Sequence, residues 1–503
     1  MGECTINKKF VSIEEAIEAI INYAISNGLI EDIDKDYIRN CYYDLFKVSN
    51  PHIFDNISSN LDEILTYMLD YAIEYHLIEA NTQAYKDLFD TKIMGFITPR
   101  PSVVVNKFQE LYKNNPYDAT NYLYKLQNQV NYIRTSRIEK DLRWKINSKY
   151  GAIDITINMS KPEKDPRDIE RAKNLVATSY PKCLLCKEYM GFFGDLLKPA
   201  RQNLRLIPIT LNNQTWYFQY SPYSYYNEHC IVLYEDHIPM YINKDTFICL
   251  LEFVEKFPHY FIGSNAELPI VGGSILSHEH FQGGKYHFSM FDAKSFYDFK
   301  LGNVSASLLV WPLSVIRLKS KNKEELIDNA TKILDLWRDY SNIDLEIISK
   351  TKSIVHNTIT PIVHKDKDIF ILDLVLRNNR TTEEYPLGIF HPHQRYHHIK
   401  KENIGLIEVL GLAVLPRRLE NELNIIKDTI LNQIDYTNYK ELDKHSQWIN
   451  HLLSTYQFDN TNIDDILRME VGERFVGVLE DAGVFKQTEV GKSAFVEFIK
   501  TIR

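Results

Sequence analysis

Histidine and glutamine side chains at alternate positions mark one short stretch of this 503-residue chain as its candidate for chemistry. His278, His280 and Gln282 stand between the glycine pairs Gly272-Gly273 and Gly283-Gly284. On an extended strand, residues two apart share one face, so both imidazoles and the amide would point the same way. A neutral imidazole can attack phosphorus, an amide can hydrogen-bond phosphoryl oxygens, and glycines let a phosphate approach the backbone. The pattern suggests phosphoryl or nucleotidyl transfer through a covalent histidine, although a metal pair or two solvated imidazoles would explain the spacing equally well.

Cys183 and Cys186 form a Cys-x-x-Cys pair, which in a reducing compartment is either half of a zinc site or a redox pair. The surrounding residues do not follow the strand-to-helix pattern of a thioredoxin-like motif. Zinc requires two more ligands, usually His or Cys, which can come from distant parts of the chain. The candidates are His229, His237 and His278, and their presence favours zinc over redox chemistry.

A third polar pattern consists of Arg201, Asn203 and Arg205, which alternate where the chain turns into strands. On a strand these three side chains would share one face. Two guanidinium groups and an amide on one face suit an anion site. Solvated surface positions explain the pattern almost as well.

The elements that must position these residues indicate an α+β chain with expected domains at residues 1–150, 151–320 and 321–503. The first domain has helical periodicity, with Ser12 and Asn60 as capping residues and Gly28 as a stop signal. Expected strands cover residues 154–158, 204–210, 215–220, 229–234, 284–290, 307–318, 353–363 and 369–377. Expected helices cover residues 245–257, 323–340 and most of the chain after 404. Strands, one helix and a late His-x-His occur in both halves after residue 150, which hints at a duplication.

Composition narrows the function classes. A net charge of −9 disfavours general nucleic-acid binding, which needs a basic surface. No apolar run approaches the length of a membrane span, and the N-terminal residues do not read as a secretory signal. Six cysteines in so long a chain do not make a disulfide framework. We therefore expect a cytoplasmic protein with more than one sizeable core.

Taken together, these motifs resemble the class II, Firmicutes-type galactose-1-phosphate uridylyltransferases of the histidine-triad-like superfamily. The resemblance extends over nearly the whole chain. It is carried by residues 98–101, 161–166, 181–186, 199–203, 218–233, 272–284, 356–361 and 397–416. It implies a histidine-triad-like antiparallel sheet, duplicated, with an N-terminal helical domain and C-terminal helices.

The resemblance also implies a double displacement. The second histidine of the motif, here His280, would attack the α-phosphorus of UDP-glucose and release glucose 1-phosphate. Galactose 1-phosphate would then take the uridylyl group, while Gln282 would hydrogen-bond the phosphoryl oxygens. The other implied substrate-binding residues are Asn265, Gly272, Gly273 and Ser274 beside the nucleotide, and Lys400, Lys401 and Asn403 at the hexose phosphate, where a solvated basic turn is the simpler alternative.

The related class I enzymes carry a structural zinc, and the resemblance places it here on Cys183, Cys186 and His278. His237 is the expected fourth ligand and His229 its competitor. A closed four-ligand site leaves no place for substrate. A second metal, which His391 and His393 would hold, lacks a clear carboxylate ligand.

The expected partners are UDP-glucose, a hexose 1-phosphate and a second copy of the chain, without nucleic acid or membrane. One alternative is a nucleotide phosphorylase or hydrolase of the same superfamily, which would use His280 with phosphate or water. Another is a zinc-stabilised nucleotide-sugar sensor without turnover, against which the intact His280 and Gln282 argue. The acidic charge disfavours a zinc-dependent nucleic-acid-binding module.

Overall fold

The computed structural model of the protein describes residues 10–54, 57, 59–159, 165–173, 175, 178–273 and 275–502. The chain divides into two compact units, each made of segments that are separate in the sequence. Unit 1 comprises residues 1–139, 161–209 and 216–224, and unit 2 comprises residues 140–160, 210–215 and 225–503. The three-domain division expected from the sequence stays a prediction.

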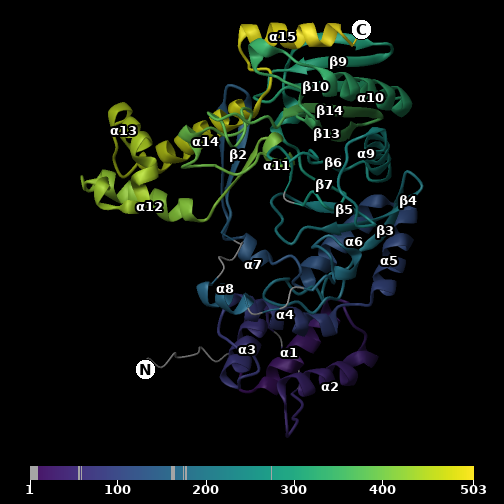
Figure 1. Ribbon diagram of the computed structural model, residues 1–503. Coiled ribbons are helices and arrows are strands. Elements are labelled where there is room, and N and C mark those ends of the chain that lie inside the picture. Colours follow the sequence, from purple (N-terminus) through teal and green to yellow (C-terminus); the bar gives the residue numbers. More distant parts are fainter. Residues whose placement is uncertain are drawn as a thin grey trace. The chain divides into compact units, whose positions relative to one another are not determined.

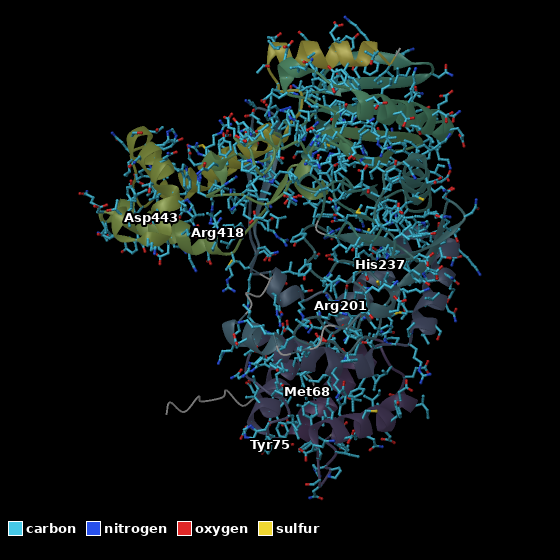
Figure 2. All side chains as sticks on the ribbon, viewed as in Figure 1. Met68, Tyr75, Arg201, His237, Arg418 and Asp443 are labelled. Atoms are coloured by element: carbon cyan, nitrogen blue, oxygen red, sulfur yellow. The ribbon has the colours of Figure 1, made fainter. Side chains whose placement is uncertain are left out.

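Unit 1 is built mainly from helices whose ends match the capping residues seen in the sequence. Its helices are α1 (Ile13–Ser26), α2 (Lys35–Phe46), α3 (Leu61–Glu74), α4 (Gln83–Ile97), α5 (Pro101–Asn114), α6 (Pro116–Gln129), α7 (Thr135–Ile138) and α8 (Pro166–Ala172). The side chains of Ser12 and Asn60 accept hydrogen bonds from backbone amides three residues further on, which confirms both helix starts. The chain leaves α1 through Gly28, whose φ of +66° favours glycine. Met68 of α3 is fully buried in this helical packing (Figure 2).

Unit 2 contains a large sheet in which the described strand pairs are antiparallel. Its strands are β5 (Cys230–Tyr234), β6 (Phe261–Gly263), β7 (His280–Gly284), β8 (Ser295–Leu301), β9 (Val304–Leu309), β10 (Val315–Ser320), β13 (Asn357–Asp366) and β14 (Ile369–Asn378). In space they run in the order β5-β7-β6-β13-β14-β10-β9-β8, and the labels of Figure 1 follow this order from β5 to β9. β3 (Ile207–Leu211) and β4 (Gln214–Tyr220) form a hairpin that is divided between the two units. This architecture confirms the expected α+β class with an antiparallel sheet.

The strand order repeats in reverse about the pair β6 and β13. In one half the chain runs through β5, helix α9 (Lys244–Lys256), β6 and β7. In the other it runs through β10, helix α10 (Lys323–Asp339), a small hairpin of β11 (Lys350–Thr351) and β12 (Ile354–Val355), then β13 and β14. Each half inserts its last strand between the two earlier ones. This repeat confirms the duplication at which the sequence hinted.

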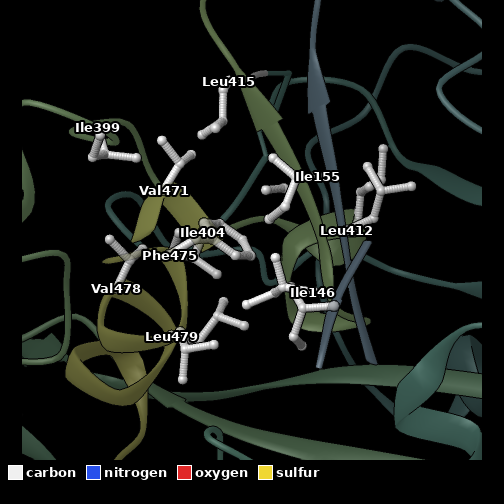
Figure 3. Packing of buried hydrophobic residues seen from close by; sticks show 14 of the residues in the cluster. Ile146, Ile155, Ile399, Ile404, Leu412, Leu415, Val471, Phe475, Val478 and Leu479 are labelled. Atoms are coloured by element: carbon white, nitrogen blue, oxygen red, sulfur yellow. The ribbon is translucent and has the colours of Figure 1, made fainter. Parts of the chain in front are cut away.

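The helices of unit 2 cover the sheet and build a second core. α9 and α10 contact each other and pack on strands β6, β10, β13 and β14, so they lie on one face (Figure 1). A smaller sheet of β1 (Leu142–Ser148), β2 (Gly151–Ile157) and β15 (Leu412–Leu415) packs with α14 (Ile463–Ala482) through residues such as Ile146, Ile155 and Phe475 (Figure 3). The remaining helices are α11 (Leu406–Val409), α12 (Arg418–Leu431), α13 (Ser446–Thr455) and α15 (Glu489–Lys500). None of the described helices combines the length and the apolar character that a membrane span needs.

Several expected elements differ from the structure. β1 lies inside the stretch expected to be helical, and β8 is absent from the expected strands. The strand expected over residues 284–290 is wrong, because β7 ends at Gly284 and a 3-10 helix follows at Ser289–Asp292. The strand expected over residues 204–210 begins only at Ile207, so Arg201, Asn203 and Arg205 do not share a strand face. Apolar runs beside turns gave these boundaries, and such runs do not define where pairing starts.

Strands β6 and β7 approach each other closely at Gly283, where a Cβ atom would lie 2.4 Å from the carbonyl oxygen of Phe261. We expect Gly283→Ala to lower the free energy of unfolding by about 2 kcal/mol, because the neighbouring backbone cannot move without breaking the ladder. Chemical denaturation followed by circular dichroism measures this change. The control is Gly302→Asn, at a turn with φ +59° and nothing within 4 Å, which should cost no more than about 0.5 kcal/mol. Equal stability of both variants would contradict the close approach.

Candidate functional site

β7 carries the His-x-His-x-Gln motif between two partner strands of the sheet. It pairs with β5 along one edge and with β6 along the other. The extended part begins at His280, so His278 precedes the strand. His280 and Gln282 lie two apart on β7 and therefore point to the same face, while Phe281 is buried on the opposite face.

His280 is buried, with 5% of its surface exposed, and one of its ring nitrogens is already engaged. Its Nδ1 lies 2.8 Å from the carbonyl oxygen of His278, a distance at which an Nδ1–H donates a hydrogen bond. The lone pair then resides on Nε2, the nitrogen that remains for a reaction. Burial lowers the pKa of His280 to about 4, so the ring is neutral near pH 7. The site therefore holds a neutral imidazole with one oriented lone pair, which is the form that can attack phosphorus.

Gln282 is half-buried, and its Oε1 lies 3.2 Å from Nε2 of His229. Within the described part of the chain its NH₂ group has no hydrogen-bond partner, so this group can donate to an anion. Sequence reasoning considered His229 only as a zinc ligand and missed its contact with Gln282. The two residues are 53 positions apart, so no local spacing reveals the contact.

Two cysteines and two histidines gather into a group that could bind a metal ion. Cys183, Cys186, His237 and His278 each offer one ligand atom, and these atoms all lie within 4.8 Å of one another. Nε2 of His278 lies 2.9 Å from the carbonyl oxygen of Tyr234, so Nδ1 is the ring nitrogen that would coordinate a metal. Two thiolates with two imidazoles are a donor set typical of tetrahedral structural sites. His229 is not part of this group, because its ring faces Gln282.

Gly272 and Gly273 lie in a loop that is packed too tightly for side chains. A Cβ atom at Gly272 would lie 2.3 Å from a backbone carbonyl oxygen, and one at Gly273 would lie 2.6 Å from Nδ2 of Asn265. The Oδ1 atom of Asn265 accepts a hydrogen bond from the amide of Leu406 at 2.9 Å. This packing explains the glycines without a ligand, so their place beside a nucleotide stays a prediction. Ser274 lies outside the described residues.

The expected anion site in unit 1 is not formed as one face, because Arg201, Asn203 and Arg205 contact different groups. Asn203 is 2% exposed, and its side-chain amide donates to the carbonyl oxygen of Val130 at 2.9 Å. Arg205 is buried and donates to several backbone carbonyl oxygens. Arg201 is half-buried, with its guanidinium 5.5 Å from the centre of the Tyr132 ring. The shared anion-binding face expected for these residues is therefore wrong, and main-chain hydrogen bonds explain both Asn203 and Arg205.

The basic segment after His398 also needs a correction. Lys400 is 5% exposed, and its Nζ lies 2.9 Å from Oε1 of Glu408 and 3.1 Å from a backbone carbonyl oxygen. Its charge is neutralised inside the protein, so it does not offer a free cation to a phosphate. Lys401 is exposed, and the side-chain oxygen of Asn403 is 3.2 Å from Nε2 of His391. Of the two lysines, only Lys401 keeps the solvated ammonium that the sequence suggested.

His391 and His393 bind different partners. His391 faces Asn403, whereas Nε2 of His393 lies 2.9 Å from the carbonyl oxygen of Ile389. Nδ1 of His393 is 3.5 Å from a carboxylate oxygen of Asp481. Among the described residues, no group suited to a metal includes either histidine. The second metal therefore gains no support.

Comparison with known proteins relates this chain to one family. The family model described as galactose-1-phosphate uridyl transferase, N-terminal domain, matches residues 28–239, and the corresponding C-terminal domain matches residues 252–449. A galactose-1-phosphate uridylyltransferase of Clostridium acetobutylicum is 52% identical over 97% of this chain and 100% of its own length. Proteins of the same name from Caldanaerobacter subterraneus and Fusobacterium nucleatum are 49% and 48% identical, over 96% and 97% of this chain and 97% and 98% of their own lengths. Among solved structures, the yeast Ap4A phosphorylase Apa2 is similar at a TM-score of 0.30 and 10% identity, over 66% of this chain and 96% of that chain.

Replacing the buried ammonium of Lys400 should destabilise the protein. We expect Lys400→Met to lower the free energy of unfolding by about 3 kcal/mol, because it leaves Glu408 buried without its cation. Denaturant titration measures the loss. Lys401→Met changes an exposed neighbour by the same substitution and should cost no more than about 0.5 kcal/mol. A Lys400→Met protein as stable as the control would show that the ion pair is dispensable.

Proposed function

Because the chain belongs to the galactose-1-phosphate uridyl transferase family, we propose that it transfers UMP from UDP-glucose to galactose 1-phosphate through a covalent uridylyl group on His280. The products are UDP-galactose and glucose 1-phosphate. One observation carries the proposal. The buried ring of His280 donates a hydrogen bond from Nδ1 to the carbonyl oxygen of His278, which leaves Nε2 as the nucleophile. A family member without this oriented nitrogen could bind the nucleotide sugar but could not hold the uridylyl group.

The first half-reaction makes one bond and breaks one. The lone pair of His280 Nε2 forms a bond to the α-phosphorus of UDP-glucose, and the bond from that phosphorus to the oxygen of glucose 1-phosphate breaks. The ring in the adduct carries a positive charge, which the hydrogen bond from Nδ1 to the carbonyl oxygen of His278 stabilises. In the second half-reaction a phosphate oxygen of galactose 1-phosphate attacks the same phosphorus, and the nitrogen–phosphorus bond breaks. The NH₂ group of Gln282 donates to the phosphoryl oxygens, where negative charge grows in both transition states.

The substrate contacts follow from the family motif. Asn265, Gly272, Gly273 and Ser274 are proposed to lie beside the nucleotide. Lys401 and Asn403 are the proposed polar contacts for the sugar phosphate, and Arg201 of unit 1 is a separate proposed anion contact. Asn203 and Lys400 are left out of this set, because both are buried and their side-chain nitrogens donate hydrogen bonds within the protein.

The metal of the Cys₂His₂ group is proposed to be zinc in a structural role. Two sulfur and two nitrogen ligands match the preference of zinc, and a site with four protein ligands has no open position for substrate. When bound, zinc would supply folding energy to the segment that leads into β7. Each step of the transfer is carried by His280 and Gln282.

The covalent step predicts a burst. Protein mixed with UDP-glucose alone should release glucose 1-phosphate in an amount equal to the protein, and rapid-quench sampling measures it. A uridylyl group should remain on the protein, labile in acid and stable in base, and both substrates together should give parallel double-reciprocal lines. His280→Ala should abolish burst and label, with a loss in rate of at least about 10⁴-fold. His287→Ala, which removes an exposed histidine, is the matched control, and a labelled His280→Ala protein would refute the mechanism.

The metal prediction separates His278 from His280. Purified protein should hold about one zinc per chain, because the four ligands form a complete set. Cys183→Ser and His278→Ala should lose that zinc, as measured by elemental analysis, whereas His280→Ala should keep it. Cys41→Ser, a free cysteine outside the group, is the control. Full zinc content in Cys183→Ser would contradict the assignment.

A further inference from the structure

On the basis of the proposed transfer, we propose that His229 is a positioning residue that holds the side-chain amide of Gln282 by its oxygen and so turns the NH₂ group toward the phosphoryl group beside His280. The observation behind it is the 3.2 Å contact between Nε2 of His229 and Oε1 of Gln282. An amide can present either its oxygen or its nitrogen to a phosphate. Only the nitrogen end donates a hydrogen bond, so something must choose between the two orientations.

The strand register places His229 on the side of Gln282 that is remote from His280. Across the pair of β5 and β7, Leu233 is opposite His280 and Cys230 is opposite Gly283. His229 precedes Cys230, so it lies beyond the Gly283 end of β7. It therefore contacts Oε1 of Gln282 from the side away from His280, and the NH₂ end of the amide is left to face His280.

The surroundings of His229 decide which ring nitrogen carries the proton. The residue is 3% exposed, and the rings of Tyr225 and Tyr226 lie 5.7 Å and 4.5 Å from its own, centre to centre. Nδ1 has no hydrogen-bond partner among the described residues. A proton there would be a buried donor without an acceptor, so the neutral ring carries its proton on Nε2. Burial also lowers the pKa of His229 to about 4, which excludes the imidazolium near pH 7.

An Nε2–H that points at Gln282 accepts only one amide orientation. With Oε1 toward His229, donor meets acceptor. With the amide turned over, the NH₂ group would face the N–H, and two donors would meet in a buried place. The hydrogen bond thus fixes the rotation of the amide before any substrate arrives, which is the preorganisation that transition-state stabilisation requires.

The turn that carries His229 is itself tied to the end of β7. The hydroxyl of Tyr226 donates to the carbonyl oxygen of Gly283 at 3.1 Å, and the amide of Lys285 donates to the carbonyl oxygen of Asn227 at 3.2 Å. Glu228 is buried between the hydroxyl of Tyr260 and the ammonium of Lys285. These contacts set the position of His229 relative to the strand that carries Gln282.

A histidine that only fills space would be equally buried, but its replacement would not be energetically coupled to the replacement of Gln282. His229→Phe keeps an aromatic ring between the two tyrosines and removes the donor. His229→Gln retains an N–H group near the former Nε2, and His229→Asn is polar but too short to reach Gln282. Gln282→Ala removes the group that His229 is proposed to orient.

The test measures the rate constant of the glucose 1-phosphate burst and the KM for UDP-glucose in these variants, alone and combined. We expect His229→Phe and His229→Asn to slow the burst by roughly 10-fold while KM changes by less than about 3-fold, and His229→Gln to recover to within about 3-fold of wild type. In the Gln282→Ala background, His229→Phe should cost less than about 2-fold more, because coupled residues are not additive. Zinc content and the unfolding midpoint control for folding, and His229→Gln and His229→Asn give the comparison should His229→Phe fail to fold.

The outcomes separate this role from the proposed function. A wild-type protein that releases no glucose 1-phosphate contradicts the transfer, and the role of His229 in it. A normal wild-type burst with an unchanged burst in His229→Phe and His229→Asn overturns the positioning role alone. An equal loss in the wild-type and Gln282→Ala backgrounds overturns it too, since it shows that His229 acts independently of the amide.

Discussion

The antiparallel pairing of β7 with β5 and β6 is the constraint on which both reacting groups depend. A strand held along both edges cannot rotate about its axis, so the directions of His280 and Gln282 are fixed together. The close approach at Gly283 excludes any side chain there and keeps β6 at the spacing that this pairing needs. The same pairing brings the turn before β5 to the end of β7, and that turn carries His229. One set of backbone hydrogen bonds therefore determines the nucleophile, the amide and the group that orients the amide.

Burial then decides the protonation states that the strand geometry alone would leave open. His280 and His229 both have pKa values lowered to about 4 by burial, so each acts as a neutral ring with one donor and one acceptor nitrogen. In His280 the carbonyl oxygen of His278 selects the tautomer. In His229 the proton lies on Nε2, facing Gln282, because Nδ1 has no hydrogen-bond partner among the described residues. Lys400 differs from both histidines, because its buried Nζ pairs with the carboxylate of Glu408. Burying a neutral nucleophile carries no penalty for desolvating a charge. A buried cation needs a charged partner and is then no longer available to substrate.

The sequence predicted those features that depend on short-range patterns. Helix starts at Ser12 and Asn60, the helices of residues 245–257 and 323–340, and the long strands β13 and β14 were all recognisable, because capping residues and apolar periodicity act locally. The polar alternation at Asn203 and Arg205 led to a wrong prediction of a shared strand face. The same alternation arises when side chains donate hydrogen bonds to buried main-chain carbonyl groups. The prediction that Lys400 contacts the hexose phosphate failed for a similar reason, because its partner Glu408 lies in a different element. The contact of His229 with Gln282 depends on strand register, which no local pattern of residues encodes.

The duplicated sheet makes the difference between its halves informative. β14 occupies in the second half the place that β7 has in the first, yet residues 369–378 contain neither histidine nor glutamine. Of its buried polar residues, Asp373 is fully buried and forms a two-point ion pair with Arg317 of β10, with distances of 2.7 Å and 2.8 Å. Arg317 also donates to the backbone carbonyl oxygens of Met290 and Phe291, so four of its five N–H groups are engaged. A phosphate that displaced Asp373 from this arginine would leave a carboxylate buried without a counter-charge. The second half therefore uses Asp373 and Arg317 for a buried ion pair, whereas Gln282 on β7 keeps an NH₂ group without a hydrogen-bond partner among the described residues.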